Sequence, residues 1–299
     1  MRKINNSTNA NGHGCCFGSL IIILLLTCAS LAQAQPSRFA AGYYNRGNER
    51  FKKGDMDGAI VDYDAALISY PRWASAYNMR GSARYNKGDL DGSILDFTKA
   101  IEINPHLDQA YYNRGKARAD KGDLDGSIND YSKAIEINPR LSSAYNNRGN
   151  ARKDKGDLDG ALADLDKAIR FEPHNALVYN NRGLVRRAKG DLQGAIADYN
   201  TAIAINPGFV EAYSNRGNLK QDRGEVDGSI ADYDQAIKID PSFAKAYGNR
   251  GLARLFQGDK VGTEKDFDQC LKLEPRLKPL LEEEIEKVKQ KLAAKIAIK

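Results

Sequence analysis

Most of the side chains that could do chemistry in this sequence recur at a fixed interval of 34 residues. One arginine and one aspartate each recur seven times at this interval, and a guanidinium and a carboxylate form charge-assisted, often paired hydrogen bonds. The arginines are Arg46, Arg80, Arg114, Arg148, Arg182, Arg216 and Arg250, and the aspartates are Asp62, Asp96, Asp130, Asp164, Asp198, Asp232 and Asp266. Because every copy carries both signs, we interpret them as a structural ion-pair ladder rather than as a ligand site.

Catalytic and metal-binding patterns find no support. The sequence lacks a G-x-x-x-x-G-K-[ST] phosphate loop, a nucleophile elbow and paired metal-ligating histidines. His106 and His174 each follow a proline in separate loops, and Cys270 occupies a small-residue packing place, which indicates an inert buried thiol. The turn at 55–58 faintly resembles a calcium loop, but helix capping explains its aspartates better. We therefore expect a protein that is not an enzyme, without cofactor or metal.

Composition excludes several further classes. The chain has 299 residues, of which 41% are hydrophobic and 28% charged, too apolar for a disordered chain and too polar for a multi-span membrane protein. The net charge of +6 is modest for this length, and we expect no nucleic-acid partner. Four cysteines and three histidines are too few and too scattered for a zinc-finger array or a disulfide-stapled fold.

The first 34 residues have the pattern of a secretory signal. A basic start is followed by an apolar run at 20–26 and by a small-x-small site that ends at Ala34. We expect this segment to be cleaved and the protein to be periplasmic or secreted, with 35–39 as a short linker. The alternative is a membrane anchor formed by 17–32 if cleavage does not occur, and a lipidated Cys28 is a third interpretation.

Glycines and prolines share the 34-residue period and divide the chain into seven copies without an insertion. In the second copy, Gly88 is placed to end a first helix, Asp89 to cap a second helix and Pro105 to end it. Each copy therefore predicts a helical hairpin, and stacking of the hairpins buries their apolar sides. The copies are 40–73, 74–107, 108–141, 142–175, 176–209, 210–243 and 244–277.

This pattern resembles the tetratricopeptide repeat (TPR) family. The aromatic-Gly-Ala-aromatic-Ala-Pro signature of the family corresponds in the second copy to Tyr77, Gly81, Ser93, Phe97, Ala100 and Pro105, and in the fifth to Tyr179, Gly183, Ala195, Tyr199, Ala202 and Pro207. The chain departs from the family in having Arg where Leu usually precedes the first Gly. The resemblance implies an all-α fold, a right-handed superhelical solenoid of antiparallel helix pairs.

The resemblance also implies that the first helix of each repeat lines a concave inner wall. Numbered from Ala40, the wall comprises the second, sixth, ninth and thirteenth places of each repeat. The sixth place holds Asn45, Asn113, Asn147, Asn181, Asn215 and Asn249, with Met79 as the exception, and candidate ninth-place residues are Lys116, Asn150 and Asn218. An amide offers a donor and an acceptor, so this row could bind an extended backbone while its variable neighbours select side chains. The alternative is that each Asn bonds the backbone of the adjoining repeat and fixes its stacking.

Two further features bear on the partner. The fifth place holds no Lys and the sixth no Arg, so a carboxylate clamp of the cytosolic chaperone type is not expected. Apolar residues spaced four, three and four apart predict an amphipathic helix at 278–299, which we expect to cap the seventh repeat. A membrane-surface or dimerising helix is the alternative.

The sequence thus favours a non-enzymatic scaffold that binds an extended polypeptide or a partner protein in its concave groove. One alternative is a structural protein that self-associates through the solenoid ends or the C-terminal helix. Another is a non-catalytic subunit of a cell-envelope complex.

Overall fold

The structure, a computed structural model, describes residues 36–297, with side chains as far as residue 293. The expected signal segment 1–34 lies outside the described residues. The described part contains 15 α-helices, one short 3-10 helix (η1) and no strand. The helices are α2 (Arg38–Lys52), α3 (Met56–Ser69), α4 (Ala74–Asn86), α5 (Leu90–Ile103), α6 (Asp108–Asp120), α7 (Leu124–Ile137), α8 (Ser142–Asp154), α9 (Leu158–Phe171), α10 (Ala176–Ala188), α11 (Leu192–Ile205), α12 (Val210–Asp222), α13 (Val226–Ile239), α14 (Ala244–Gln257), α15 (Lys260–Leu273), η1 (Pro275–Leu277) and α16 (Lys278–Ala297).

Each repeat folds as the sequence predicts, with a first helix, a tight turn and a second helix. Gly88 follows the first helix of the second repeat with a φ of 83°, a left-handed conformation that favours glycine. The Asp89 side chain then accepts a hydrogen bond from the Gly92 N–H and caps α5. The same turn and cap recur along the array, except that Glu225 makes no side-chain cap on α13.

Close contact of the two helices in a repeat depends on a glycine in the first helix. A Cβ atom on Gly81 would lie 2.8 Å from the Phe97 ring, so only glycine lets the ring approach α4 this closely. Small residues are also fully buried, with Ala83 packed against Tyr63 of the preceding repeat and Ala100 against Ala110 of the next. The core consists of clusters of rings and small side chains, most of which bridge two neighbouring repeats.

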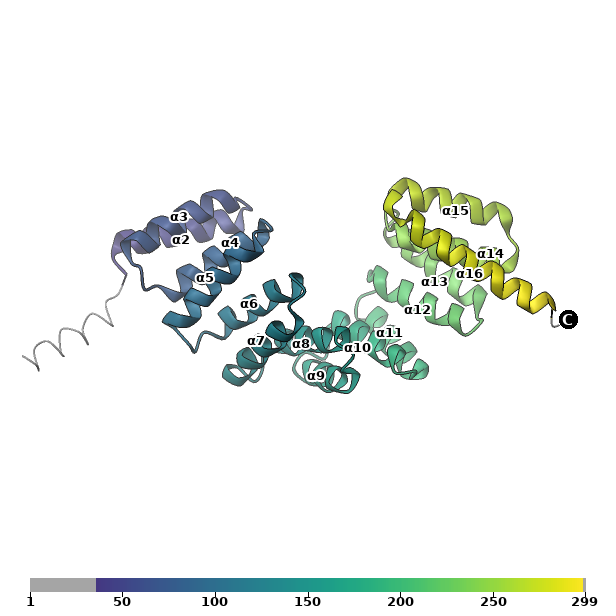
Figure 1. Cartoon of the computed structure of the whole chain (residues 1–299), viewed down its shortest axis with the longest axis horizontal. Coiled ribbons are helices and arrows are strands. Elements are labelled where there is room, and N and C mark those ends of the chain that lie inside the picture. Colours follow the sequence, from purple (N-terminus) through teal and green to yellow (C-terminus); the bar gives the residue numbers. More distant parts are fainter. Residues whose placement is uncertain (1–35, 298–299) are drawn as a thin grey trace, which may run out of the picture.

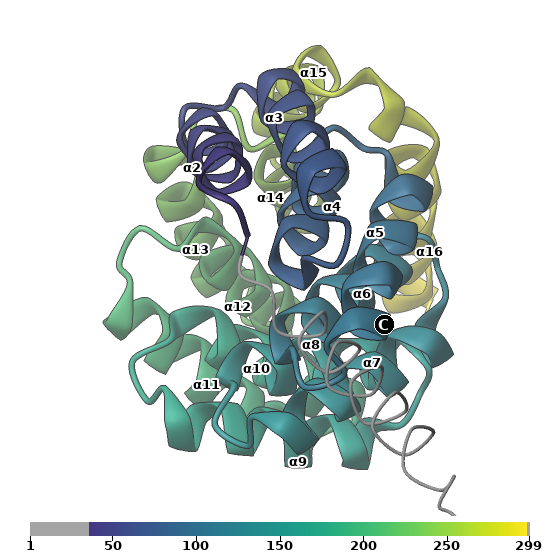
Figure 2. The same cartoon turned by 90° about the vertical axis from the view of Figure 1, so that its left-hand side faces the viewer.

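The helix pairs stack into a superhelical array. Figure 1 shows them as an arch, with α2 and α3 at one end, α8, α9 and α10 at its base, and α15 at the other end. In the view along the array in Figure 2, α4, α8, α10, α12 and α14 lie nearer the middle, and α5, α9, α11, α13 and α15 lie outside them. The first helices therefore form the inner wall.

Both ends of the array differ from its middle. Helix α2 begins at Arg38, inside the segment 35–39 expected as a linker, and the Ser37 hydroxyl caps it. At the other end, α16 packs against α14, with Leu281 and Val288 buried against Leu252. The first helix of a further repeat would pack mainly against the second helix before it, α15. Helix α16 instead packs mainly against α14. Figure 2 shows it at the edge of the ring of helices, away from the middle.

Candidate functional site

The predicted ion-pair ladder is confirmed. In the third repeat, Arg114 donates to both Asp130 oxygens from Nε and Nη2 at 2.9 and 2.7 Å, and Arg118 Nη1 donates to Asp130 Oδ2 at 2.8 Å. The Asp130 carboxylate is buried. The same group of two cations around one buried carboxylate recurs in all seven repeats, with Lys220 replacing the second arginine in the sixth.

The ladder also joins neighbouring repeats, which the sequence did not reveal. Arg80 pairs with Asp96 in its own repeat and, through Nη1, with Asp64 of the preceding repeat at 2.6 Å. Burial lowers the pKa of the Arg80 guanidinium, but hydrogen bonds and charges from Asp96 and Asp64 outweigh this effect and raise the pKa. Its guanidinium also lies 5.2 Å from the Tyr77 ring centre. These cations are therefore occupied by structural partners.

The row of asparagines lies where consecutive first helices meet, and its side chains bond to side chains of the preceding repeat. Asn181 Nδ2 donates to Asn146 Oδ1 at 2.9 Å, from the sixth place of one repeat to the fifth place of the repeat before. We call this line of contacts the amide seam. Its other donor–acceptor pairs are Asn113–Asn78 at 3.0 Å, Asn147–Tyr112 hydroxyl at 3.2 Å, Asn215–Asn180 at 2.9 Å and Asn249–Asn218 at 2.8 Å.

The seam uses only part of each amide. An Asn side chain has two N–H donors and one acceptor oxygen. In the described residues no group donates to the Oδ1 atoms of Asn181, Asn215 and Asn249, and each of their Nδ2 atoms donates one hydrogen bond. The oxygens of Asn113 and Asn147 accept from Gln109 and Asn146. Stacking contacts within this part of the chain thus leave unpaired amide oxygens in the fifth to seventh repeats, of which that of Asn181 belongs to a residue only 8% exposed.

The seam does not reach the first repeat. Asn45 is exposed and forms no hydrogen bond within the described residues, which contain no repeat before the first. The second repeat has Met79 at the sixth place, and Tyr44 packs on Trp73 instead, with ring centres 4.5 Å apart. Among the sixth-place candidates, the structure therefore brings together those of repeats three to seven.

The ninth-place candidates have different surroundings. Lys116 and Asn150 line a polar cavity of about 330 Å³ between the third and fourth repeats, and Lys116 Nζ lies 4.8 Å from the Tyr85 ring centre. The Tyr85 hydroxyl donates to Asp120, which also lines this cavity. Asn218 Oδ1 accepts hydrogen bonds from the Tyr233 hydroxyl and from Asn249 Nδ2, both at 2.8 Å, and so connects the seam to the second helix.

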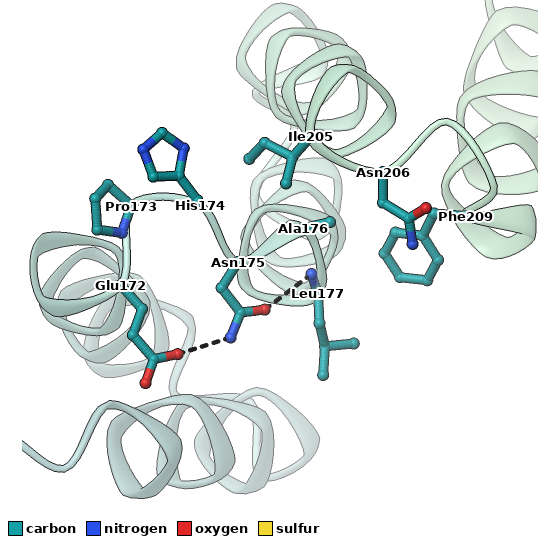
Figure 3. A pocket seen from close by; sticks show the side chains of 9 residues that line it. All are labelled: Glu172, Pro173, His174, Asn175, Ala176, Leu177, Ile205, Asn206 and Phe209. Atoms are coloured by element: carbon teal, nitrogen blue, oxygen red, sulfur yellow. Dashed lines mark hydrogen bonds between the residues drawn. The ribbon is translucent and has the colours of Figure 1, made fainter.

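A larger cavity of about 760 Å³ lies where the loops before α10 and α12 approach each other (Figure 3). Its lining is Glu172, Pro173, His174, Asn175, Ala176, Leu177, Ile205, Asn206 and Phe209. Asn175 stands at the last place of its repeat, where the other repeats carry Trp, Leu or Phe. Its side chain accepts from the Leu177 N–H at 3.2 Å and donates to Glu172 at 2.9 Å, as the dashed lines show. This cavity was not predicted from the sequence, although the single polar residue at the last place of the repeats could have indicated it.

Two absences hold for the described residues. No group of three His, Cys, Asp or Glu side chains is arranged to hold a metal ion in this part of the chain. Within residues 36–297, none of the helices has the length and apolar character needed to cross a membrane.

A family profile described as TPR repeat matches the chain at residues 81–122, 115–155, 149–187, 183–222 and 217–258, which together span more than half of its length. No curated protein sequence matches the chain significantly.

Three solved structures show the likeness of the fold. A tetratricopeptide repeat protein from Parabacteroides merdae has a TM-score of 0.69 and 19% identity, covering 84% of this chain and 99% of that one. A chain of the APC/C hetero-tetramer Cut9–Hcn1 has a TM-score of 0.68 and 16% identity, covering 81% and 48%. PilF from Pseudomonas aeruginosa has a TM-score of 0.62 and 17% identity, covering 73% and 97%. At these identities the comparison concerns the fold alone.

Proposed function

Since the chain belongs to the tetratricopeptide repeat family, a non-catalytic fold family whose members typically act as protein–protein interaction scaffolds, we propose that it binds an extended polypeptide along its inner wall. The observation that carries this proposal is the amide capacity left free by the seam. A polypeptide backbone presents an N–H and a C=O at regular intervals, and a side-chain amide can pair with both. The seam repeats a side-chain amide from the third repeat to the seventh, and among the described residues its oxygen is unpaired in the fifth, sixth and seventh repeats.

Differences between repeats would select the side chains of the ligand. The cavity beside Lys116 and Asp120 carries both charges and favours polar side chains. The fifth repeat is apolar at the matching places, with Leu177 half exposed beside the larger cavity. A ligand lying along the wall would therefore contact a polar surface at the third and fourth repeats and an apolar surface at the fifth.

The test begins with a displayed library of random peptides selected on the protein, and then measures binding of an enriched peptide by titration calorimetry. We expect the triple variant N181A/N215A/N249A to bind at least tenfold more weakly, because each lost hydrogen bond contributes about 1 kcal/mol. The matched control is K99A/K133A, which removes two exposed Lys–Glu pairs from second helices. Equal loss in both variants, or none in the triple variant, would contradict the proposal.

One observation supports a second function, assembly through the first repeat. Phe39 is 80% exposed, and the Arg46 side chain is 53% exposed, whereas its six equivalents are between 13% and 18% exposed. In each of the other repeats, the preceding repeat covers the equivalent arginine. Light scattering at several concentrations separates the two functions, since a monomer at all of them excludes self-assembly through this face.

We further propose that the protein works outside the cytoplasm and meets its partner there. The basis is the sequence of residues 1–34, with an anchor formed by 17–32 as the alternative. N-terminal sequencing of protein recovered from the producing cells tests this point. A chain that begins at Gln35 supports export with cleavage, and an intact N-terminus in the membrane fraction supports the anchor.

A further inference from the structure

The twenty-fourth place of four repeats holds a tyrosine that packs against the first-helix glycine, namely Tyr63, Tyr131, Tyr199 and Tyr233. In the sixth repeat, Tyr233 donates to Asn218 Oδ1 at 2.8 Å and contacts Gln221 Oε1 at 3.0 Å. In the first repeat, Tyr63 donates to Asn48 Oδ1 at 2.8 Å. These acceptors occupy the ninth and twelfth places of the first helix.

Tyr199 is the equivalent residue of the fifth repeat, and its hydroxyl has no partner. The residue is fully buried. Among the buried side-chain nitrogen and oxygen atoms of the described residues, this hydroxyl alone forms no hydrogen bond. A buried donor left without an acceptor costs about 1–3 kcal/mol, so the arrangement requires an explanation.

The Tyr199 hydroxyl lacks an acceptor at the two places of the first helix that supply acceptors in the sixth repeat. In the fifth repeat they hold Leu184 and Arg187. Leucine has no polar atom, and an arginine side chain only donates. The ninth and twelfth places of α10 therefore offer no acceptor to this hydroxyl. Tyr199 packs in one cluster with Leu184 of α10 and Leu219 of α12, so the residue lies where these two first helices meet.

Arg187 has N–H donors that form no hydrogen bond within the described residues. Its Nη2 pairs with Asp222 Oδ2 at 2.5 Å across the same seam, and this is its one ion pair in the described residues. About a third of its side chain is exposed. Burial raises the pKa of Tyr199 to about 12, and the positive charge of Arg187 acts in the opposite direction, as expected for neighbouring groups.

We propose that the fifth repeat contains a carboxylate subsite, in which Arg187 and the Tyr199 hydroxyl hold an acidic side chain of the bound polypeptide. A carboxylate only accepts hydrogen bonds and carries the charge opposite to that of Arg187. It would reach the hydroxyl when the Leu184 side chain rotates aside, and it would compete with Asp222 for the guanidinium. The subsite rests on the proposed function, because it needs a polypeptide on the inner wall.

The experiment uses the peptides enriched from the displayed library, synthesised in pairs that differ by Glu or Gln at one position. We expect one position at which the wild-type protein prefers Glu by about tenfold, the contribution of one hydrogen bond to a charged group. The variant Y199F keeps the ring and removes the hydroxyl, so it should lose this preference without a lower melting temperature. The control Y233F removes a hydroxyl that is already satisfied, and it should keep the preference.

A second variant tests the competition. D222N weakens the internal pairing of Arg187, so the Glu peptide should bind D222N more tightly than wild type while the Gln peptide is unaffected. Enriched peptides with no Glu preference, or a preference that survives in Y199F, would overturn the subsite and leave the proposed function standing. A library from which no peptide is enriched would overturn both.

Discussion

Replacing Asp130 by Ala should destabilise the array far more than any exposed charge substitution. The Asp130 carboxylate is 1% exposed and accepts hydrogen bonds from Arg114 and Arg118, which are 13% and 26% exposed. Three hydrogen bonds to charged groups are lost, a gross loss of about 4.5–9 kcal/mol. Water reaches part of both arginines and recovers some of this loss, and breaking a buried pair typically costs about 3–5 kcal/mol. We therefore expect a loss within that lower range.

Asp125 provides the control on the same helix. It pairs with Lys155, but its side chain is 81% exposed, so D125A should cost less than about 1 kcal/mol. Urea unfolding followed by circular dichroism measures both variants, with the whole transition analysed because a repeat array can unfold in parts. Equal stability of D130A and D125A would refute the structural role of the ladder.

Three further predictions follow from packing and burial. Gly183→Ala places a carbon 2.6 Å from the Tyr199 ring, and we expect a loss of about 1–3 kcal/mol in urea unfolding; unchanged stability would contradict the close packing. Burial raises the pKa of the Cys270 thiol, so a thiol reagent should react with it slowly at pH 8 and rapidly after unfolding in urea, whereas equal rates would show that it is accessible. Leu281→Ala should cost about 2–5 kcal/mol because this side chain is 7% exposed, whereas Leu280→Ala, at 57% exposed, should cost much less; equal melting temperatures would refute the packing of α16.

The sequence predicted the fold in detail because each repeat repeats the same local signals. Gly88, Asp89 and Pro105 act within a few residues of themselves, and the residues at these places in the other repeats set the turns and helix ends there, with Glu225 in place of the aspartate in the sixth. The partner of Arg114 was also predictable, since a helical hairpin brings Asp130 opposite to it.

The candidate site was less predictable because it depends on how neighbouring repeats align. The seam joins Asn181 to Asn146, which are 35 residues apart and not the 34 of the repeat, and only the stacked helices set this offset. Asn249 pairs instead with Asn218, 31 residues away, because the fifth place of the preceding repeat holds the shorter Ser214. The missing partner of Tyr199 was likewise not predictable, because only the structure of the sixth repeat shows that the ninth and twelfth places supply the acceptors for this tyrosine.

The central claim, that a polypeptide lies on the inner wall, is tested most directly by site-specific photo-crosslinking. A benzophenone amino acid is placed either at Lys116 on the inner wall or at Lys133 on the outer helix α7, and each protein is irradiated with an enriched, labelled peptide. We predict efficient crosslinks from position 116 that excess unlabelled peptide abolishes, and none from position 133. Crosslinks from position 133 alone, or equally from both positions, would contradict the account.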